Sequence, residues 1–249
     1  MGDKKTNDLL FFVFGIEEND DEREKIEACM DRAYLDLCRT LKFKYSTKQL
    51  SEKEEDASKN KEKEDFKNNK EDFKTKVKNT IRESLDPLNA NRFDCNKGFD
   101  EWHENTIRNI IRKIKCSKNV DIFKEDFTVG HAQKWLNMTL KYMLIMGILP
   151  EEWEEFLHIP LDDYILKAAY NEFNVNRNNY NVNGNNYKID KWSKIKEYDN
   201  YLAYQKRIRE QVKNQKEKLN GGAEKKYKSP AQWESEAWIR EAKKRAYTE

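Results

Sequence analysis

The feature that most restricts the fold of this chain is the spacing of its apolar residues, which recur at steps of three and four. Such spacing places apolar side chains on one face of an α-helix, whereas a half-buried strand needs strict alternation, which is nearly absent here. Between positions 20 and 41 the apolar face consists of Ile26, Met30, Ala33, Tyr34, Leu37 and Leu41. Between positions 99 and 115 it consists of Trp102, Ile107, Ile110, Ile111 and Ile114. We therefore predict an all-α fold.

Two stretches in the first third of the chain leave alternatives open. Residues 8–16 are apolar and fit either a short strand or a helical turn. The segment 51–74 is rich in Lys, Glu, Asp and Asn, which is typical of either a mobile insert or a solvated helix with interspersed opposite charges. The helical spacing of Phe66, Phe73, Val77 and Ile81 favours a helix in its second half, ending before Asp86-Pro87.

The last third of the chain contains one loop and two predicted helices. Residues 174–188 are rich in Asn with a central Gly, a composition that suits turns. Helical spacing resumes over 192–219, and Gly221-Gly222 is expected to end that helix. Ser229-Pro230 predicts the start of a final helix, because Ser is a good N-cap and Pro is favoured at the first helical position.

Composition restricts the class of protein more than its activity. A chain of 249 residues can bury a sizeable core, and its 12% aromatic content offsets a charged content of 38%. The net charge of +2 neither supports nor excludes a nucleic-acid partner. No stretch is long and apolar enough to cross a bilayer, and the apolar run 9–16 is followed by acidic residues instead of a signal-peptide cleavage site. We therefore expect a cytoplasmic protein without a membrane partner.

The cysteines and histidines give no sign of a metal site. Cys29, Cys38, Cys95 and Cys116 are not spaced like metal-binding pairs, and we expect free thiols, no metal and no cofactor. His103, on the predicted helix 99–115, could act in catalysis. A lone histidine on an amphipathic helix is more often a packed or surface residue, and nothing at metal-ligand spacing accompanies it.

The stretch with the strongest candidates for a chemical role is the predicted helix 131–146. Lys134, Met138 and Lys141 lie at i, i+4 and i+7 and share one side of this helix. Burial or a neighbouring positive charge favours the neutral amine of a lysine, which is the nucleophilic form. The alternative is that both lysines extend from an ordinary core helix to solvent.

A second polar feature follows at 158–166, where Ile159-Pro160-Leu161-Asp162 precedes an apolar helix. Asp162 occupies the position expected for a helix N-cap, and capping alone explains it. An aspartate facing a lysine could also take part in attack on a sugar carbon. The sequence leaves these two roles open.

Three motifs in this order resemble the helix-hairpin-helix DNA glycosylases, and most closely the archaeal 8-oxoguanine DNA glycosylase family. They are Val129-Gly130 before the lysine helix, the Ile-Pro-Leu-Asp segment ending at Asp162, and a Pro-x-x-x-x-Ser-x-x-Trp pattern. The family also has a second lysine seven residues after the first, as Lys141 follows Lys134. The pattern is carried by Pro230, Ser235 and Trp238. The chain departs from the family by lacking a full Gly-x-Gly hairpin and by having Leu before the aspartate.

The resemblance implies a single two-lobed helical domain. Residues 1–115 would supply N-terminal helices with the charged insert 51–74, residues 116–173 the hairpin and catalytic-helix lobe, and residues 174–249 the Asn-rich loop and C-terminal helices. It also implies a DNA glycosylase that excises a damaged or modified base, such as 8-oxoguanine, from double-stranded DNA, with strand cleavage as a further step. We expect a monomer.

The resemblance assigns roles to individual residues. Lys134 would attack the anomeric carbon of a flipped nucleotide, and Asp162 would deprotonate it or stabilise charge on the sugar. Trp238 would stack on the base, although core packing is the commoner use of such a residue. Backbone N–H groups of Val129, Gly130 and His131 would contact a DNA phosphate. Lys141 could tune the pKa of Lys134, contact DNA or pair with an acid.

Two other functions remain compatible with the sequence. A non-catalytic helical DNA-binding module would hold the DNA backbone without needing Lys134 for binding. A helical protein-interaction factor would dock through the charged segment 51–74 and would not bind DNA.

Overall fold

The computed structural model describes residues 4–46, 49–50, 56–85, 93, 95–116, 122–176, 180–182, 185–189, 191–219 and 222–246. Its α-helices are α1 (Lys4–Phe14), α2 (Glu22–Cys38), α4 (Ala57–Leu85), α5 (Asn96–Lys115), α6 (Val129–Ile145), α7 (Asp163–Phe173), α8 (Tyr198–Asn214) and α9 (Pro230–Ala246). Two 3-10 helices, η3 (Glu151–Glu155) and η4 (Trp192–Lys194), connect them. The predicted all-α class is confirmed.

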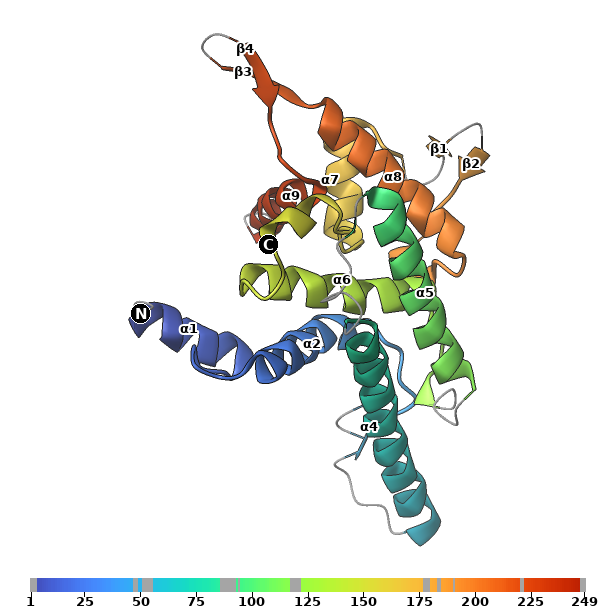
Figure 1. The fold of residues 1–249 in the computed structure, drawn as a ribbon. Coiled ribbons are helices and arrows are strands. Elements are labelled where there is room, and N and C mark those ends of the chain that lie inside the picture. The colour runs from blue at the N-terminus through green and yellow to red at the C-terminus, as the bar shows by residue number, and fades with distance from the viewer. Residues whose placement is uncertain are drawn as a thin grey trace.

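Helix α6 runs through the middle of the molecule, with α2 along one side and α7 and α9 on the other (Figure 1). Most of its residues are buried, on every face, as expected for a helix surrounded by others. The Trp135 indole N–H donates to the Met30 carbonyl of α2 over 3.0 Å, and its ring lies against Tyr34. Any side chain of α6 that lines a cavity is therefore held by a rigid helix.

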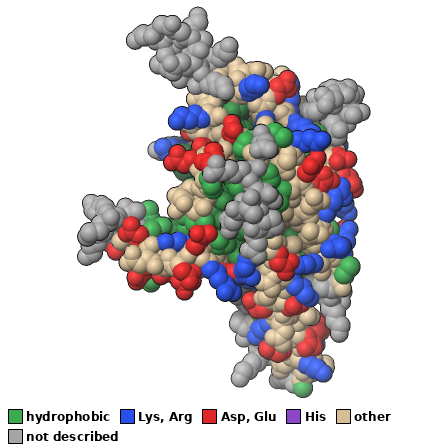
Figure 2. Space-filling view, viewed as in Figure 1, with side chains coloured by type: hydrophobic (Ala, Val, Ile, Leu, Met, Phe, Trp, Pro, Cys, Tyr) green, Lys and Arg blue, Asp and Glu red, His purple; other side chains and the backbone are tan. Residues whose placement is uncertain are grey.

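Helix α4 extends away from this core (Figure 1). Lys and Arg side chains alternate with Asp and Glu side chains over its exposed surface (Figure 2). Lys74 and Lys78 of α4 form ion pairs of 3.0 Å and 2.9 Å with Asp31 of α2. Of the two alternatives for 51–74, the solvated helix is therefore found over 57–74, while 51–55 lie outside the described residues.

Two sequence-based interpretations of secondary structure need correction. Residues 4–14 form a helix, so the strand alternative for the first apolar stretch was wrong. The predicted helix 192–219 is instead η4, then α8, then strand β3 (Lys216–Leu219), which pairs antiparallel with β4 (Gly222–Lys225). A second hairpin, β1 (Tyr180–Val182) with β2 (Asn185–Tyr187), lies within the Asn-rich stretch. Two adjacent glycines suit a hairpin turn as well as a helix end, which explains the misplaced boundary.

A buried polar network ties the central helices together. His103 of α5 contacts the Tyr198 hydroxyl and the Asn137 side chain, each at 2.8 Å. His158 contacts the Tyr201 hydroxyl at 2.8 Å and the Asp100 carboxylate at 2.7 Å. Burial holds the pKa of His103 well below its usual value, and it lowers the pKa of His158 to about 4. Burial thus favours the neutral form of both rings, and His103 is a packed residue, the commoner of its two sequence-based interpretations.

No helix in the described part of the chain combines the length and apolarity needed to cross a membrane.

Candidate active site

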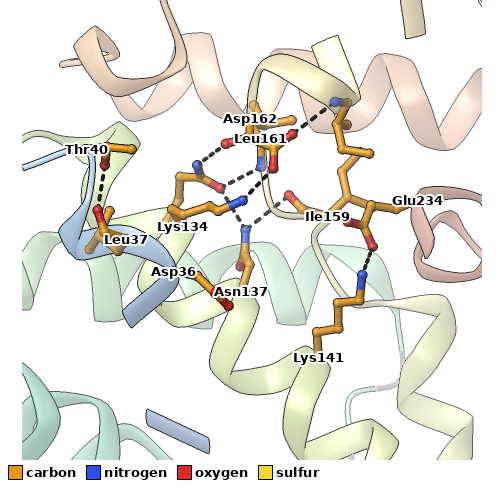
Figure 3. A network of polar contacts seen from close by, with 12 residues as sticks. Asp36, Leu37, Thr40, Lys134, Asn137, Lys141, Ile159, Leu161, Asp162 and Glu234 are labelled. Atoms are coloured by element: carbon orange, nitrogen blue, oxygen red, sulfur yellow. Dashed lines mark hydrogen bonds and ion pairs between the residues drawn. The ribbon is translucent and has the colours of Figure 1, made fainter. Parts of the chain in front are cut away.

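Lys134 and Asp162 meet in a buried ion pair (Figure 3). Lys134 lies in the second turn of α6, and its Nζ is 2.6 Å from Asp162 Oδ2. The other carboxylate oxygen, Oδ1, accepts the Ile165 amide over 3.0 Å and so caps the N-terminus of α7. Asp162 therefore caps α7 with one oxygen and contacts Lys134 with the other, so capping does not exclude a second role for this carboxylate.

The pair lines a cavity of about 920 Å³ between α2, α6, α7 and α9. Trp192 of η4 forms part of its wall, and the Lys134 ammonium lies 5.9 Å from the centre of the Trp192 ring. An amine at a concave surface beside a fixed carboxylate is an arrangement suited to nucleophilic attack on an electrophilic carbon, with the carboxylate as proton acceptor.

A second lysine–carboxylate pair lies farther along α6 (Figure 3). Lys141 Nζ is 2.5 Å from Glu234 Oε2 of α9, and both residues line the cavity. Burial raises the pKa of the Glu234 carboxyl, although the Lys141 charge opposes that shift. Of the three roles considered for Lys141, pairing with an acid is the one seen in this conformation.

Trp238 is the tryptophan of α9 that reaches the cavity. It is 39% exposed and packs edge-to-face against Tyr164, with ring centroids 5.4 Å apart. Trp233 is instead fully buried, where its ring packs on Phe173 and its indole N–H donates to Glu172 over 3.1 Å. The residue chosen by its spacing is thus the one that offers an accessible aromatic surface.

The N-terminus of α6 is covered by protein. Val129, Gly130 and His131 are buried. The Gly130 amide donates to the Ile195 carbonyl over 3.0 Å, and the His131 amide donates to Thr128 Oγ1 over 3.3 Å. A Cβ on residue 130 would overlap the Trp192 carbonyl oxygen, so the close approach of η4 explains this glycine. This conformation does not present the amides of 129–131 to a phosphate, in contrast to the sequence-based expectation.

Cations are instead distributed around the cavity on three helices. Lys167 of α7 is paired with Glu241 at 3.3 Å, and its side chain remains 63% exposed. Arg39 at the end of α2 is exposed. Five positively charged residues line the cavity in addition to the two paired lysines. We call them the rim cations, and they are Arg32, Arg39, Lys167, Lys244 and Arg245.

Sequence reasoning missed Glu234, Trp192, Arg32, Arg39 and Lys167. Glu234 had a usable signal, since it lies four residues before Trp238 and so on the same side of α9. Trp192 and the α2 arginines had none, because only tertiary packing brings them to the lysine helix. The described residues contain no group of three or more His, Cys, Asp or Glu side chains that could hold a metal ion.

Comparisons with protein-family models, with curated proteins and with solved structures find no match to this chain.

Proposed function

We propose that this protein is a DNA glycosylase/lyase that removes a damaged or modified base through a Schiff base on Lys134. The observation that carries the proposal is the 2.6 Å contact between Lys134 Nζ and Asp162 at the wall of a cavity large enough for a nucleotide. The proposal includes a two-lobed helix-hairpin-helix glycosylase architecture, in keeping with the order of the lysine, aspartate and tryptophan motifs.

The reaction follows from the pair. The Lys134 ammonium transfers one proton to Asp162, and the amine lone pair then forms a bond to C1′ of a flipped nucleotide. The base leaves with the electron pair of the glycosidic bond and takes up one of the two protons that the attacking nitrogen then carries. Opening of the sugar ring, with transfer of the remaining amine proton to O4′, gives an imine to Lys134. Proton abstraction at C2′ then permits β-elimination of the 3′ phosphate, which is the lyase step.

Recognition of DNA uses the rest of the cavity. Trp238 offers the exposed aromatic face on which an extruded base stacks. The backbone phosphates are neutralised by the rim cations of α2, α7 and α9, in place of the buried amides at 129–131. Oxidised purines such as 8-oxoguanine are the first substrates to test, because the resemblance points to them.

Borohydride trapping tests the proposal directly. The protein is incubated with duplexes carrying 8-oxoguanine or an abasic site, reduced, and analysed for a covalent protein–DNA band, together with Lys134→Gln and Lys141→Gln. We expect a band with the wild type and none with Lys134→Gln. Lys141→Gln should still give a band, although a weaker one, because the attacking amine of Lys134 is present in that variant.

A non-catalytic DNA-binding module is the second candidate, and the rim cations favour it independently of Lys134. It predicts salt-sensitive binding that survives Lys134→Gln, with no covalent band on either duplex. The absence of both band and binding would reject the glycosylase and the DNA-binding module together.

A further inference from the structure

The segment that carries Asp162 is buried and enclosed by helices. Ile159 and Leu161 are fully buried, and neither belongs to a helix or a strand. A buried peptide in such a segment has no ladder partner, and leaving its N–H or C=O unpaired would cost about 1–3 kcal/mol for each group. Pro160 between them has no N–H and contributes only a carbonyl, so the N–H donors to be satisfied here are those of residues 159 and 161.

Two glutamines satisfy these groups in the same way. Gln205 of α8 accepts the Ile159 N–H over 3.1 Å and donates to the Ile159 carbonyl over 2.8 Å. Gln133 of α6 accepts the Leu161 N–H over 3.1 Å and donates to the Leu161 carbonyl, also over 3.1 Å. Each side-chain amide therefore takes the place of a neighbouring strand at one residue of the segment.

The Gln133 contact lies beside the candidate catalytic pair. Gln133 directly precedes Lys134, and Leu161 directly precedes Asp162, so the amide contact and the ion pair are consecutive links between the same two segments. Gln133 also donates to the Gly130 carbonyl over 3.0 Å, and its Oε1 accepts from Asn137 over 3.1 Å. Asn137 donates in addition to the Ile159 carbonyl (Figure 3). Gln133 is thus held on both sides and cannot change rotamer without breaking several hydrogen bonds.

We propose that Gln133 is a positioning residue, which sets the Asp162 carboxylate against the Lys134 amine by fixing the Leu161 peptide. The inference rests on the proposed function. Gln133 is fully buried and does not line the cavity, so it acts through Leu161 and Asp162 instead of touching DNA. A displacement of about 1 Å at a reacting group can cost on the order of 100-fold in rate.

Gln205 provides a matched control. It makes the same two hydrogen bonds to the same segment, is equally buried, and binds two residues farther from Asp162. Replacing either glutamine by methionine preserves the approximate volume and removes both bonds to the segment, and at Gln133 it also removes the bonds to Gly130 and Asn137. A purely structural role predicts that the loss of rate follows the loss of stability in both variants, whereas positioning predicts a loss of rate in Gln133→Met that is out of proportion to its loss of stability.

The experiment measures thermal stability, the single-turnover rate constant of base release at saturating DNA, and the DNA concentration at half-saturation. We expect a lower Tm for both variants, with the larger reduction in Gln133→Met, which loses two further hydrogen bonds. Gln133→Met should lower the single-turnover rate constant about 10–100-fold with unchanged half-saturation, while Gln205→Met should stay within about threefold of the wild type. Equal losses of rate in both variants, or no loss in Gln133→Met, would overturn the inference.

A second readout does not require glycosylase activity. Lysine labelling by acetic anhydride, followed across pH and resolved by mass spectrometry, reports the environment of Lys134 with Lys141 as an internal reference. We expect Gln133→Met to shift the labelling profile of Lys134 and leave that of Lys141, and Gln205→Met to change neither. An unchanged Lys134 profile in Gln133→Met overturns the positioning role. A shifted profile in a protein that never traps DNA would refute the proposed function alone.

If Gln133→Met does not fold, Gln133→Glu replaces it. A glutamate keeps an oxygen for the Leu161 N–H and loses the amide donor to the Leu161 and Gly130 carbonyls. We expect an intermediate loss of rate and a smaller shift of the Lys134 labelling profile. Wild-type values for both would overturn the inference.

Discussion

Helix α6 carries two lysine–carboxylate pairs, seven residues apart, and both line one cavity. In each pair the nitrogen–oxygen distance is short, at 2.6 Å for Lys134–Asp162 and 2.5 Å for Lys141–Glu234. By spacing and chemistry they look equivalent. The two pairs differ in which other groups hold each carboxylate.

Asp162 is fixed by groups other than its lysine. Its Oδ1 accepts the Ile165 amide at the start of α7, and Gln133 holds the preceding peptide. Glu234 is more deeply buried, with a side chain only 2% exposed. Within the described part of the chain, Lys141 is the only hydrogen-bond donor to its carboxylate. Burial accordingly raises the pKa of Glu234.

This difference in how the two carboxylates are held indicates which lysine is suited to react. If Lys134 leaves Asp162 to form a bond with a sugar, the Asp162 carboxylate still accepts the Ile165 amide and stays in position to accept and donate protons. If Lys141 left, a buried carboxylate would lose its hydrogen-bond donor, which is costly. The pair at 134 and 162 is suited to chemistry, and the pair at 141 and 234 is suited to maintaining the shape of the cavity.

Removing the charge of each carboxylate should give the largest difference between the two pairs. Asp162→Asn keeps an N-cap, because asparagine caps helices as well as aspartate, but it cannot accept the proton from Lys134. We expect the single-turnover rate of base release to fall about 10²–10⁴-fold, the range for loss of a general base. Glu234→Gln is the matched variant, and its rate should fall less. A larger loss in Glu234→Gln would reverse the assignment of the two pairs.

Removing each lysine should separate the pairs by stability. Lys141→Met leaves Glu234 buried without a partner, and we expect the free energy of unfolding at neutral pH to drop by about 3–5 kcal/mol. Lys134→Met leaves Asp162 bonded to the Ile165 amide, so its loss should be smaller, about 1–3 kcal/mol. Urea unfolding of both variants measures the difference. Equal losses would show that the helix cap does not support the Asp162 carboxylate.

The pH dependence of stability gives the smallest effect. Because the folded-state pKa of Glu234 is raised, its contribution to stability is complete below its unfolded pKa of about 4.3 and is lost as the pH rises through the folded value. The free energy of unfolding of the wild type minus that of Glu234→Gln should therefore fall as the pH rises above about 4.

His131 provides a control of opposite sign. Burial lowers its pKa to about 4, so its contribution is present above the unfolded value of about 6.5 and is lost as the pH falls through about 4. The wild type minus His131→Gln difference should rise as the pH rises above about 4, whereas the Glu234 difference should fall. A Glu234 difference that does not vary with pH would remove the proposed contrast between the two carboxylates.

Much of this protein was predictable because its determinants are local. The helices at 22–38, 96–115, 129–145 and 230–246 follow from apolar spacing, and the last of them also from the Ser229-Pro230 start signal. Lys134, Asp162 and Trp238, chosen from short motifs, line the same cavity. Their proposed roles in catalysis and base stacking remain predictions.

Other features were decided by contacts between distant residues. Gly130 looked like part of a phosphate-binding turn, but η4, some sixty residues later, covers it and takes its amide. The spacing of Glu234 from Trp238 placed it on the same side of α9, but only the packing of α9 set it against Lys141. The antiparallel pairing of residues 216–219 with 222–225 took the place of the last part of a predicted helix.

The sequence by itself thus determined the helical class, the caps and the side of α6 on which both lysines lie, since these depend on residues within one or two helical turns. Only the tertiary structure decided which carboxylate faces which lysine, which amides are already bonded and how each acid is held. The physical reason is that burial and pairing of charges depend on helix packing, which brings residues 28 and 93 positions apart into contact with α6.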